Sequence, residues 1–171
     1  DVAGNGPVRL QVSVTIAGDT AVVDWTGSAA QVRSAINCPL TNTRAAAYGA
    51  LLGAFVEDIP NNEGLYRPIT IVAPPGTIMN PLRPAAHVSR GIVTARMIDA
   101  ILGALHQALP DRIPAAGDGG MHIAMIGGVH DDGRIIRTNV NSCLESWGGA
   151  PGRDGIEGVG PYQANLAAYR I

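Results

Sequence analysis

Apolar and polar residues alternate at the beginning of the chain. Positions 8, 10, 12, 14 and 16 are Val, Leu, Val, Val and Ile, and the positions between them are Arg, Gln, Ser and Thr. A period of two is typical of a strand with one buried face, so we predict a strand over residues 8–16. The turn residues 17–19 and the apolar run 20–25 then predict that the chain returns as a β-hairpin.

Two later segments carry apolar residues at helical spacing. Thr43 is a candidate N-cap for a helix over residues 44–55. A second helix is predicted over residues 91–109 and ends before Pro110. Its apolar stripe consists of Met97, Ile98, Ile101, Leu102, Leu105 and Leu109. Gly103 lies beside this stripe, where its small size would permit close packing.

The remaining pattern is that of short strands and turns. We expect a loop over residues 58–64, a strand over 68–73, and a hairpin that joins 122–128 to 134–140 through the turn 131–133. After Cys143 the chain is rich in glycine, and we expect irregular structure to the end. Strands that pair locally, with helices between them, predict an α+β fold of mainly antiparallel β hairpins with two principal helices.

The charge composition excludes several kinds of chemistry. All 12 basic residues are arginine, against 14 acidic residues, so the net charge is −2. Without lysine the chain has no Schiff-base amine, lysine general base or P-loop lysine. Because the sequence has no basic run, we expect neither nucleic-acid nor membrane-surface binding. No signal peptide and no run long enough to span a bilayer is found, so the cytoplasm is the expected compartment.

Charged residues are scarce. They make up 15% of the sequence, against about 25% in an average soluble domain. Two explanations remain open on composition alone: burial of part of the surface in a larger assembly, or the composition of an arginine-only protein from a GC-rich genome.

Residues that carry chemistry are few. No two of the four histidines have the spacing of ligands on one helix face, and only His122, beside the glycine-rich segment 117–120, is a plausible site histidine. Ser142 and Cys143 lie in no nucleophile-elbow motif, and we expect buried small residues there. The neighbours Arg153 and Asp154 have the chemistry to bind a carboxylate, although a solvated turn is the commoner outcome.

A series of motifs nevertheless resembles one family in order. The segments 24–28 (DWTGS), 31–33 (QVR) and 36–40 (INCPL) are similar to the D-F-T-G-S, Q-V-R and I-N-A-P-L pattern of the hydantoinase B/oxoprolinase family. The resemblance continues through 43–46, 59–64, 67–69, 74–81, 99–105 and 114–117, and it closes on 147–155 (WGGAPGRDG). The sequence differs from the family's usual residues at positions 85–90 and matches them only loosely at 165–169.

The resemblance implies an ATP-dependent system in which an A-type subunit holds ATP and phosphorylates an amide, lactam or enol oxygen. The B-type part then supports hydrolysis or carboxylation, because phosphorylation converts a poor electrophile into one with a good leaving group. We therefore expect a hydrolase acting on cyclic amides, part of a larger hydantoinase B-like fold. This segment is expected to bind no cofactor, with ATP and a divalent metal bound elsewhere in the assembly.

Members of the family are several times longer, and the resemblance places their metal-binding motifs upstream of the part matched here. We accordingly expect residues 1–171 to form a single partial domain, the middle-to-C-terminal portion of such a chain. Its partners would be a hydantoinase A-like subunit, the remainder of the B-type chain and a small-molecule substrate, and we expect no activity from it alone.

The candidate catalytic residues are Asp118 and His122, which would transfer protons. Arg153 and Asp154 are candidates for substrate binding, and Arg153 would hold an anionic oxygen. The alternative is a non-catalytic assembly module of such a complex or of a related ATP-dependent ketone carboxylase.

Overall fold

The computed structural model describes residues 4, 6–54, 60, 62–119, 123–141 and 145–159. Its helices are α1 (Leu40–Ala54), α2 (Glu63–Tyr66) and α3 (Arg90–His106). Its strands are β1 (Ser13–Ala17), β2 (Thr20–Asp24), β3 (Ile69–Val72), β4 (Ile123–Val129), β5 (Ile135–Asn141), β6 (Glu145–Trp147) and β7 (Ile156–Val159). No described helix is long and apolar enough to cross a membrane.

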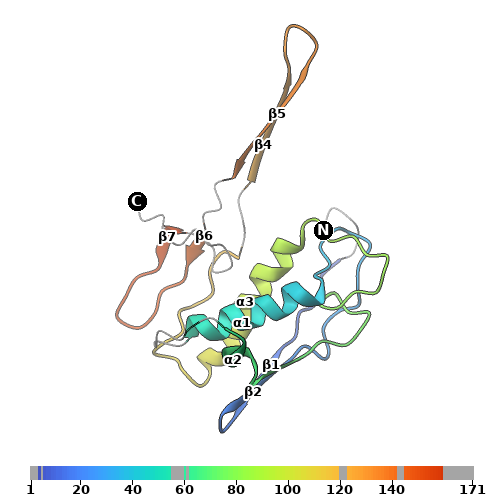
Figure 1. Ribbon diagram of the computed structural model, residues 1–171. Coiled ribbons are helices and arrows are strands. Elements are labelled where there is room, and N and C mark those ends of the chain that lie inside the picture. Colours follow the sequence, from blue (N-terminus) through green and yellow to red (C-terminus); the bar gives the residue numbers. More distant parts are fainter. Residues whose placement is uncertain are drawn as a thin grey trace.

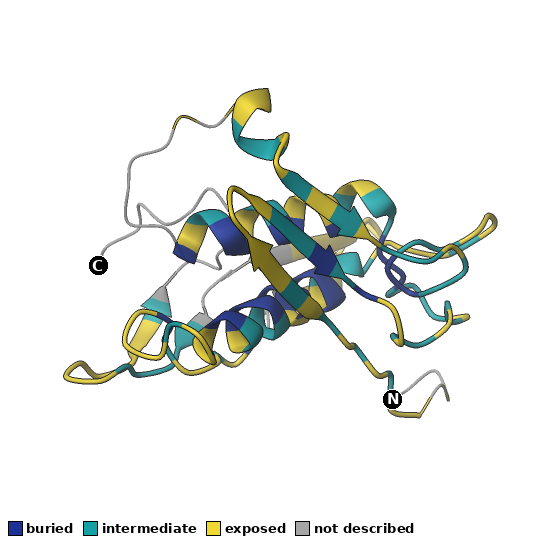
Figure 2. Cartoon of the chain, turned by 90° about the horizontal axis from the view of Figure 1, so that it is seen from below, coloured by how far each residue is buried: buried dark blue, intermediate teal, exposed yellow. Residues whose placement is uncertain are grey.

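A three-stranded sheet covers one side of the two long helices (Figures 1 and 2). The predicted hairpin is present as β1 and β2, which pair antiparallel, and Gly18 takes a positive φ of 59° in the turn between them. β3 lies against the other edge of β2 and runs parallel to it, because α1 carries the chain back across the sheet. The fold is thus α+β, as predicted, with antiparallel strand pairs and one parallel pair.

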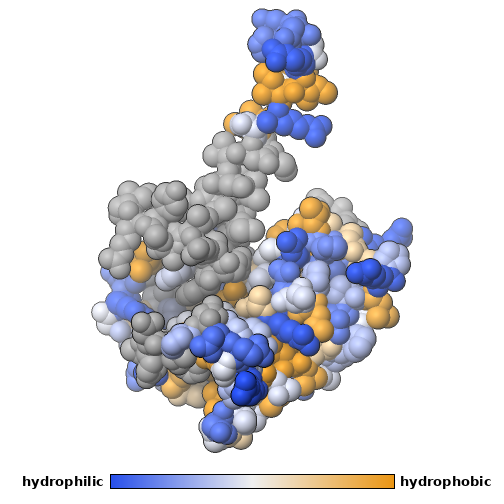
Figure 3. Space-filling model, in the orientation of Figure 1, coloured by the Kyte–Doolittle hydropathy of each residue, from blue (hydrophilic) through white to orange (hydrophobic). Residues whose placement is uncertain are grey.

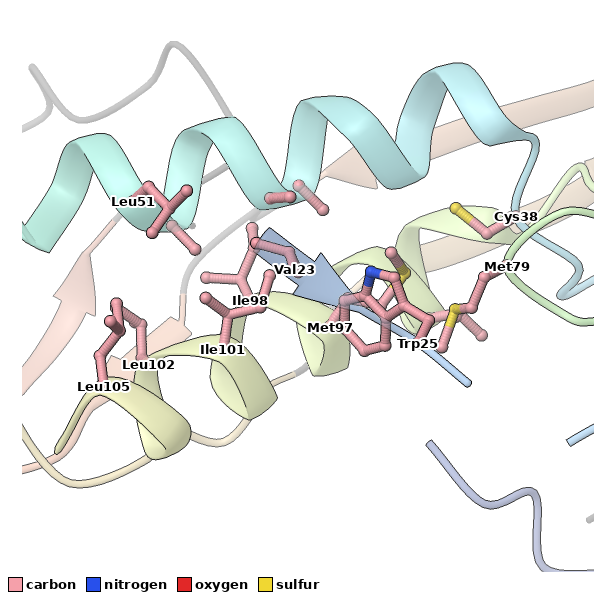
Figure 4. Packing of buried hydrophobic residues seen from close by; sticks show 14 of the residues in the cluster. Val23, Trp25, Cys38, Leu51, Met79, Met97, Ile98, Ile101, Leu102 and Leu105 are labelled. Atoms are coloured by element: carbon pink, nitrogen blue, oxygen red, sulfur yellow. The ribbon is translucent and has the colours of Figure 1, made fainter. Parts of the chain in front are cut away.

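The core lies between α1, α3 and the sheet (Figure 4). The stripe predicted on α3 is buried from Met97 to Leu105: Met97 and Ile101 have no exposed surface, and Ile98 is 2% exposed. α3 ends at His106, so Leu109 lies beyond the helix and is only partly buried. α1 contributes mostly alanines, Ala46, Ala47, Ala50 and Ala54, whose small side chains let the two helices pack closely. Val23, Trp25, Ile78 and Met79, all fully buried, close the core from the sheet side.

Several sequence predictions about the elements are wrong. The strand predicted over residues 8–16 is present only from Ser13 onwards. α1 begins at Leu40, so Thr43 is not its N-cap; inside the first turn, the Thr43 hydroxyl donates to the Met79 carbonyl at 2.6 Å. The expected loop 58–64 overlaps the short helix α2 at Glu63 and Gly64, and Asn62 caps this helix. The segment expected to be irregular after Cys143 contains β6 and β7, which pair antiparallel.

β4 and β5 form an arm that projects away from the helices (Figure 1). They pair antiparallel over seven residues each, and within the described residues they pair with no other strand. Ile126, Val129, Ile135 and Ile136 on the arm are 50–72% exposed. Their apolar surface stands out just below the hydrophilic tip in Figure 3.

Candidate functional site

Polar residues of the N-terminal motifs bind the backbone. Asn37 is fully buried, and its Oδ1 accepts the Val32 N–H at 2.8 Å. Its Nδ2 donates to the carbonyls of Val32, Ser34 and Ala86 at 2.8–3.1 Å. Every polar group of this amide is occupied by main chain, so Asn37 organises the loop before α1.

Two more motif residues act in the same way. Gln31 makes a reciprocal pair with the backbone of Leu82, with its Oε1 accepting at 2.7 Å and its Nε2 donating at 3.2 Å. The Ser28 hydroxyl exchanges bonds of 2.9–3.0 Å with the backbone of Gln11. Cys38, between them and α1, is fully buried, and burial raises the pKa of its thiol, which makes it a poor nucleophile. This part of the motif pattern therefore builds the fold.

Glycines of the later motifs allow backbone segments to touch. A Cβ added at any of three positions would overlap a carbonyl oxygen, so that only glycine fits. These close contacts join Gly117 to Ser146, Gly148 to Ala115, and Gly155 to Trp147. The loop before residue 118 is thereby fixed against β6 and the turn that follows it.

The turn between β6 and β7 brings two of the predicted site residues to one pocket. Arg153 and Asp154 line a cavity of about 190 Å³. The turn itself is closed by reciprocal bonds between the backbones of Ala150 and Arg153 at 3.0 and 3.1 Å. The apolar part of the wall includes Leu102, Ile113, Trp147 and Ile156.

Arg112 lines the same pocket, and sequence reasoning missed it. It lies in the loop after α3, about forty residues from Arg153, so no local spacing connects the two. Within the described residues neither arginine forms an ion pair. Two guanidinium groups beside an apolar wall have the chemistry to hold a carboxylate or phosphate oxygen.

The structure does not place Asp118 in this pocket. Asp118 is exposed; its backbone N–H donates to the Ser146 carbonyl at 3.2 Å, and its own carbonyl accepts from Arg96 Nη2. His122, the other candidate for proton transfer, lies outside the described residues, as do Ser142 and Cys143.

A second groove lies on the neighbouring side of α3. It has a volume of about 340 Å³ and is lined by Asp99 and His106 from the helix, and by residues of the loops 113–116 and 149–151. Asp99 belongs to a family-like segment but was not predicted as a site residue. The signal that was available is its spacing from Gly103 and His106, which places all three on one helix face.

The carboxyl group of Asp99 has a raised pKa, and several neighbours contribute to the shift. Burial raises its pKa, the Arg96 guanidinium and the Gly117 N–H lower it, and the charge of Asp118 raises it. Its side chain is 15% exposed and lies 3.4 Å from Arg96 Nη1. Among the described residues no group of three His, Cys, Asp or Glu side chains lies close enough together to hold a metal ion.

Comparisons with known proteins agree with the motif pattern. The sequence profile of the family Hydantoinase B/oxoprolinase matches residues 1–170. The putative B-type component of a D-/L-hydantoinase from a Pseudomonas species is 33% identical over 165 residues, which are 92% of this chain and 27% of that protein.

Solved structures are similar as well. The ATP-dependent caprolactamase of Pseudomonas jessenii superposes with a TM-score of 0.74 at 30% identity, over 92% of this chain and 28% of that one. An acetone carboxylase in its nucleotide-free state gives a TM-score of 0.80 at 16% identity, over 96% of this chain and 22% of that one, which shows a shared fold. The chain spans about a quarter of the length of these relatives, between 22% and 28%. By its match over nearly every residue, this chain belongs to the hydantoinase B/oxoprolinase family.

Proposed function

We propose that this chain is a fragment or split subunit of an ATP-dependent amidohydrolase that opens hydantoin, lactam or 5-oxoproline rings. It would work with an A-type ATP-binding subunit and the remainder of a B-type chain, which bring ATP and a divalent metal. The observation that carries the proposal is the family match over residues 1–170. The similarity to the B-type component of a hydantoinase and to an ATP-dependent caprolactamase supports the reaction class.

Within that reaction, the pocket of Arg112 and Arg153 would hold an anionic oxygen of the substrate or its phosphorylated form. Asp154, in the same pocket, would orient the arginines or accept an N–H of the substrate. Asp118 and His122 remain proposed proton-transfer groups.

The test is ATP-dependent ring opening by the assembled complex, measured with hydantoin, ε-caprolactam and 5-oxoproline. We expect Arg153→Ala and Arg112→Ala to lower kcat/KM by about tenfold or more, because each removes a charge-assisted hydrogen bond. The matched control is Arg134→Ala, at the exposed tip of the arm, which should leave kcat/KM unchanged. His122→Ala tests the proton-transfer role in the same assay. Unchanged activity in the Arg153 and His122 variants together would contradict the proposed site.

A second candidate is a non-catalytic assembly module of such a complex, or of a related ATP-dependent ketone carboxylase. Two observations favour it: the motif residues Gln31 and Asn37 are committed to the backbone, and the arm exposes four large apolar side chains. Expression of the chain alone tests this candidate. Aggregation that a partner relieves would support the module, whereas a stable monomer would count against it.

A further inference from the structure

The groove on α3 has a regular polar and apolar arrangement along its length. Asp99, Gly103 and His106 follow one another at intervals of four and three residues, so they lie on one face of the helix. At 1.5 Å per residue the two polar ends are separated by about 10 Å along the axis. Opposite this face stand the loops 113–116 and 149–151.

Gly103 opens the middle of the groove. Glycine in a helix interior costs about 1 kcal/mol relative to alanine, so its presence calls for a reason. The sequence suggested close packing, and that expectation is wrong: a Cβ placed on Gly103 would meet no atom within 4 Å beyond its own neighbourhood in the helix. The absence of a side chain at Gly103 leaves the middle of the groove open.

Both polar ends present hydrogen-bond acceptors. Asp99 accepts the Gly117 N–H, and its ion pair with Arg96 is long at 3.4 Å, so the carboxylate keeps further lone pairs for a ligand. Arg96 is also engaged elsewhere, because its Nη2 donates to the Asp118 carbonyl. His106 Nδ1 lies 2.9 Å from the Ile113 carbonyl and must donate to it, which leaves Nε2 as an acceptor in the neutral ring.

The wall between these ends is apolar. It is made by Leu102, Ile113, Pro114, Ala115, Ala116 and Pro151. A ligand seated at Asp99 must therefore carry hydrogen-bond donors without an acceptor at its head, and a hydrocarbon body behind it along the apolar wall.

We propose that this groove binds a small aliphatic amine in its ammonium form, with the nitrogen at Asp99 and the hydrocarbon chain along Gly103 towards His106. An ammonium group has three donors and no acceptor, which matches a mostly buried carboxylate. The site does not depend on the proposed hydrolase function, and its test needs neither ATP nor a partner.

The experiment is a titration of the 171-residue chain with n-hexylammonium chloride, followed by calorimetry and by amide chemical shifts. The uncharged probe 1-hexanol has the same hydrocarbon length. We expect saturable binding of the ammonium at least about tenfold tighter than that of hexanol, since only the cation gains from the carboxylate. Shifts should be largest at residues 99, 103 and 117.

Gly103→Leu fills the groove without removing any native contact. The matched control is Gly49→Leu on α1, where a Cβ also meets open space and which does not line this groove. Both variants should raise Tm slightly through helix propensity, but only Gly103→Leu should abolish ammonium binding. Asp99→Asn should weaken it about tenfold while retaining the hexanol affinity. Equal affinity for hexanol and hexylammonium, binding that Gly103→Leu leaves intact, or no saturable binding to the wild-type chain would each overturn the proposal.

Discussion

Two regions of this molecule carry similar apolar residues and use them differently. On α3, Ile98 and Ile101 are 2% and 0% exposed, because α1 and the sheet cover them. On the β4–β5 arm, Ile126 and Ile135 are 60% and 72% exposed, and no described element packs over them. A two-stranded hairpin is marginally stable by itself. Apolar residues thus locate elements along the chain, whereas their burial depends on which other elements pack against them.

The largest expected difference is in how much an Ile→Ala substitution lowers the free energy of unfolding in each region. Ile101→Ala should lower the free energy of unfolding by about 3–4 kcal/mol, because it leaves a cavity in a closed core. The matched change Ile135→Ala on the arm should alter it by less than about 0.5 kcal/mol. Denaturant unfolding of the chain measures both. Comparable losses at the two sites would mean that the arm is folded against the body in solution.

Substitution of a polar residue should likewise cost more stability in the core than in the arm. Asn37→Ala leaves a buried N–H and three carbonyls without their partner, so we expect a loss of about 2–3 kcal/mol. In the arm, Asp132 contacts Arg134 at 2.7 Å and His130 at 3.3 Å, and all three side chains are exposed to solvent. Asp132→Asn should therefore produce no measurable change in the same unfolding assay. A large effect of Asp132→Asn would contradict this contrast between core and arm.

Among the substitutions at buried positions, the smallest effect is expected at Trp25. Trp25 is fully buried, and its Nε1 has no hydrogen-bond partner among the described residues. Trp25→Phe removes this unsatisfied donor but also loses packing volume, so the two effects offset and stability should stay within about 1 kcal/mol. Trp25→Ala, the control, should cost about 3–5 kcal/mol. A loss of that size for Trp25→Phe would show that the indole N–H is satisfied in solution.

Much of the architecture could be predicted from the sequence, and the errors have a common cause. The stripe of α3 and the turn at Asp131-Asp132-Gly133 were predicted because they depend on local periodicity and turn residues; Gly133 does take a positive φ of 84°. The pairing of β6 with β7 was missed because glycines interrupt any alternation there. The parallel neighbour of β2 was missed because it comes from beyond α1.

For the candidate site, too, local motifs predicted some residues, and only the folded structure showed the others. Arg153 and Asp154 were predicted from a local motif, and both line one pocket. Arg112 joins them only through the packing of the loop after α3 on the turn between β6 and β7. Asp118 was predicted as a proton-transfer group of the same site; its backbone is bound to Ser146 and Arg96, and it does not line that pocket.

The family, the order of most elements and the helix face that forms the core could all be inferred without coordinates, since motifs and periodicity carry them. The folded chain was needed to show that Asn37 clamps the backbone, that Gly103 faces open space, and that Arg112 and Arg153 line one pocket. Hydrogen bonding and packing between distant segments depend on distances in space, and residue spacing along the chain does not encode those distances.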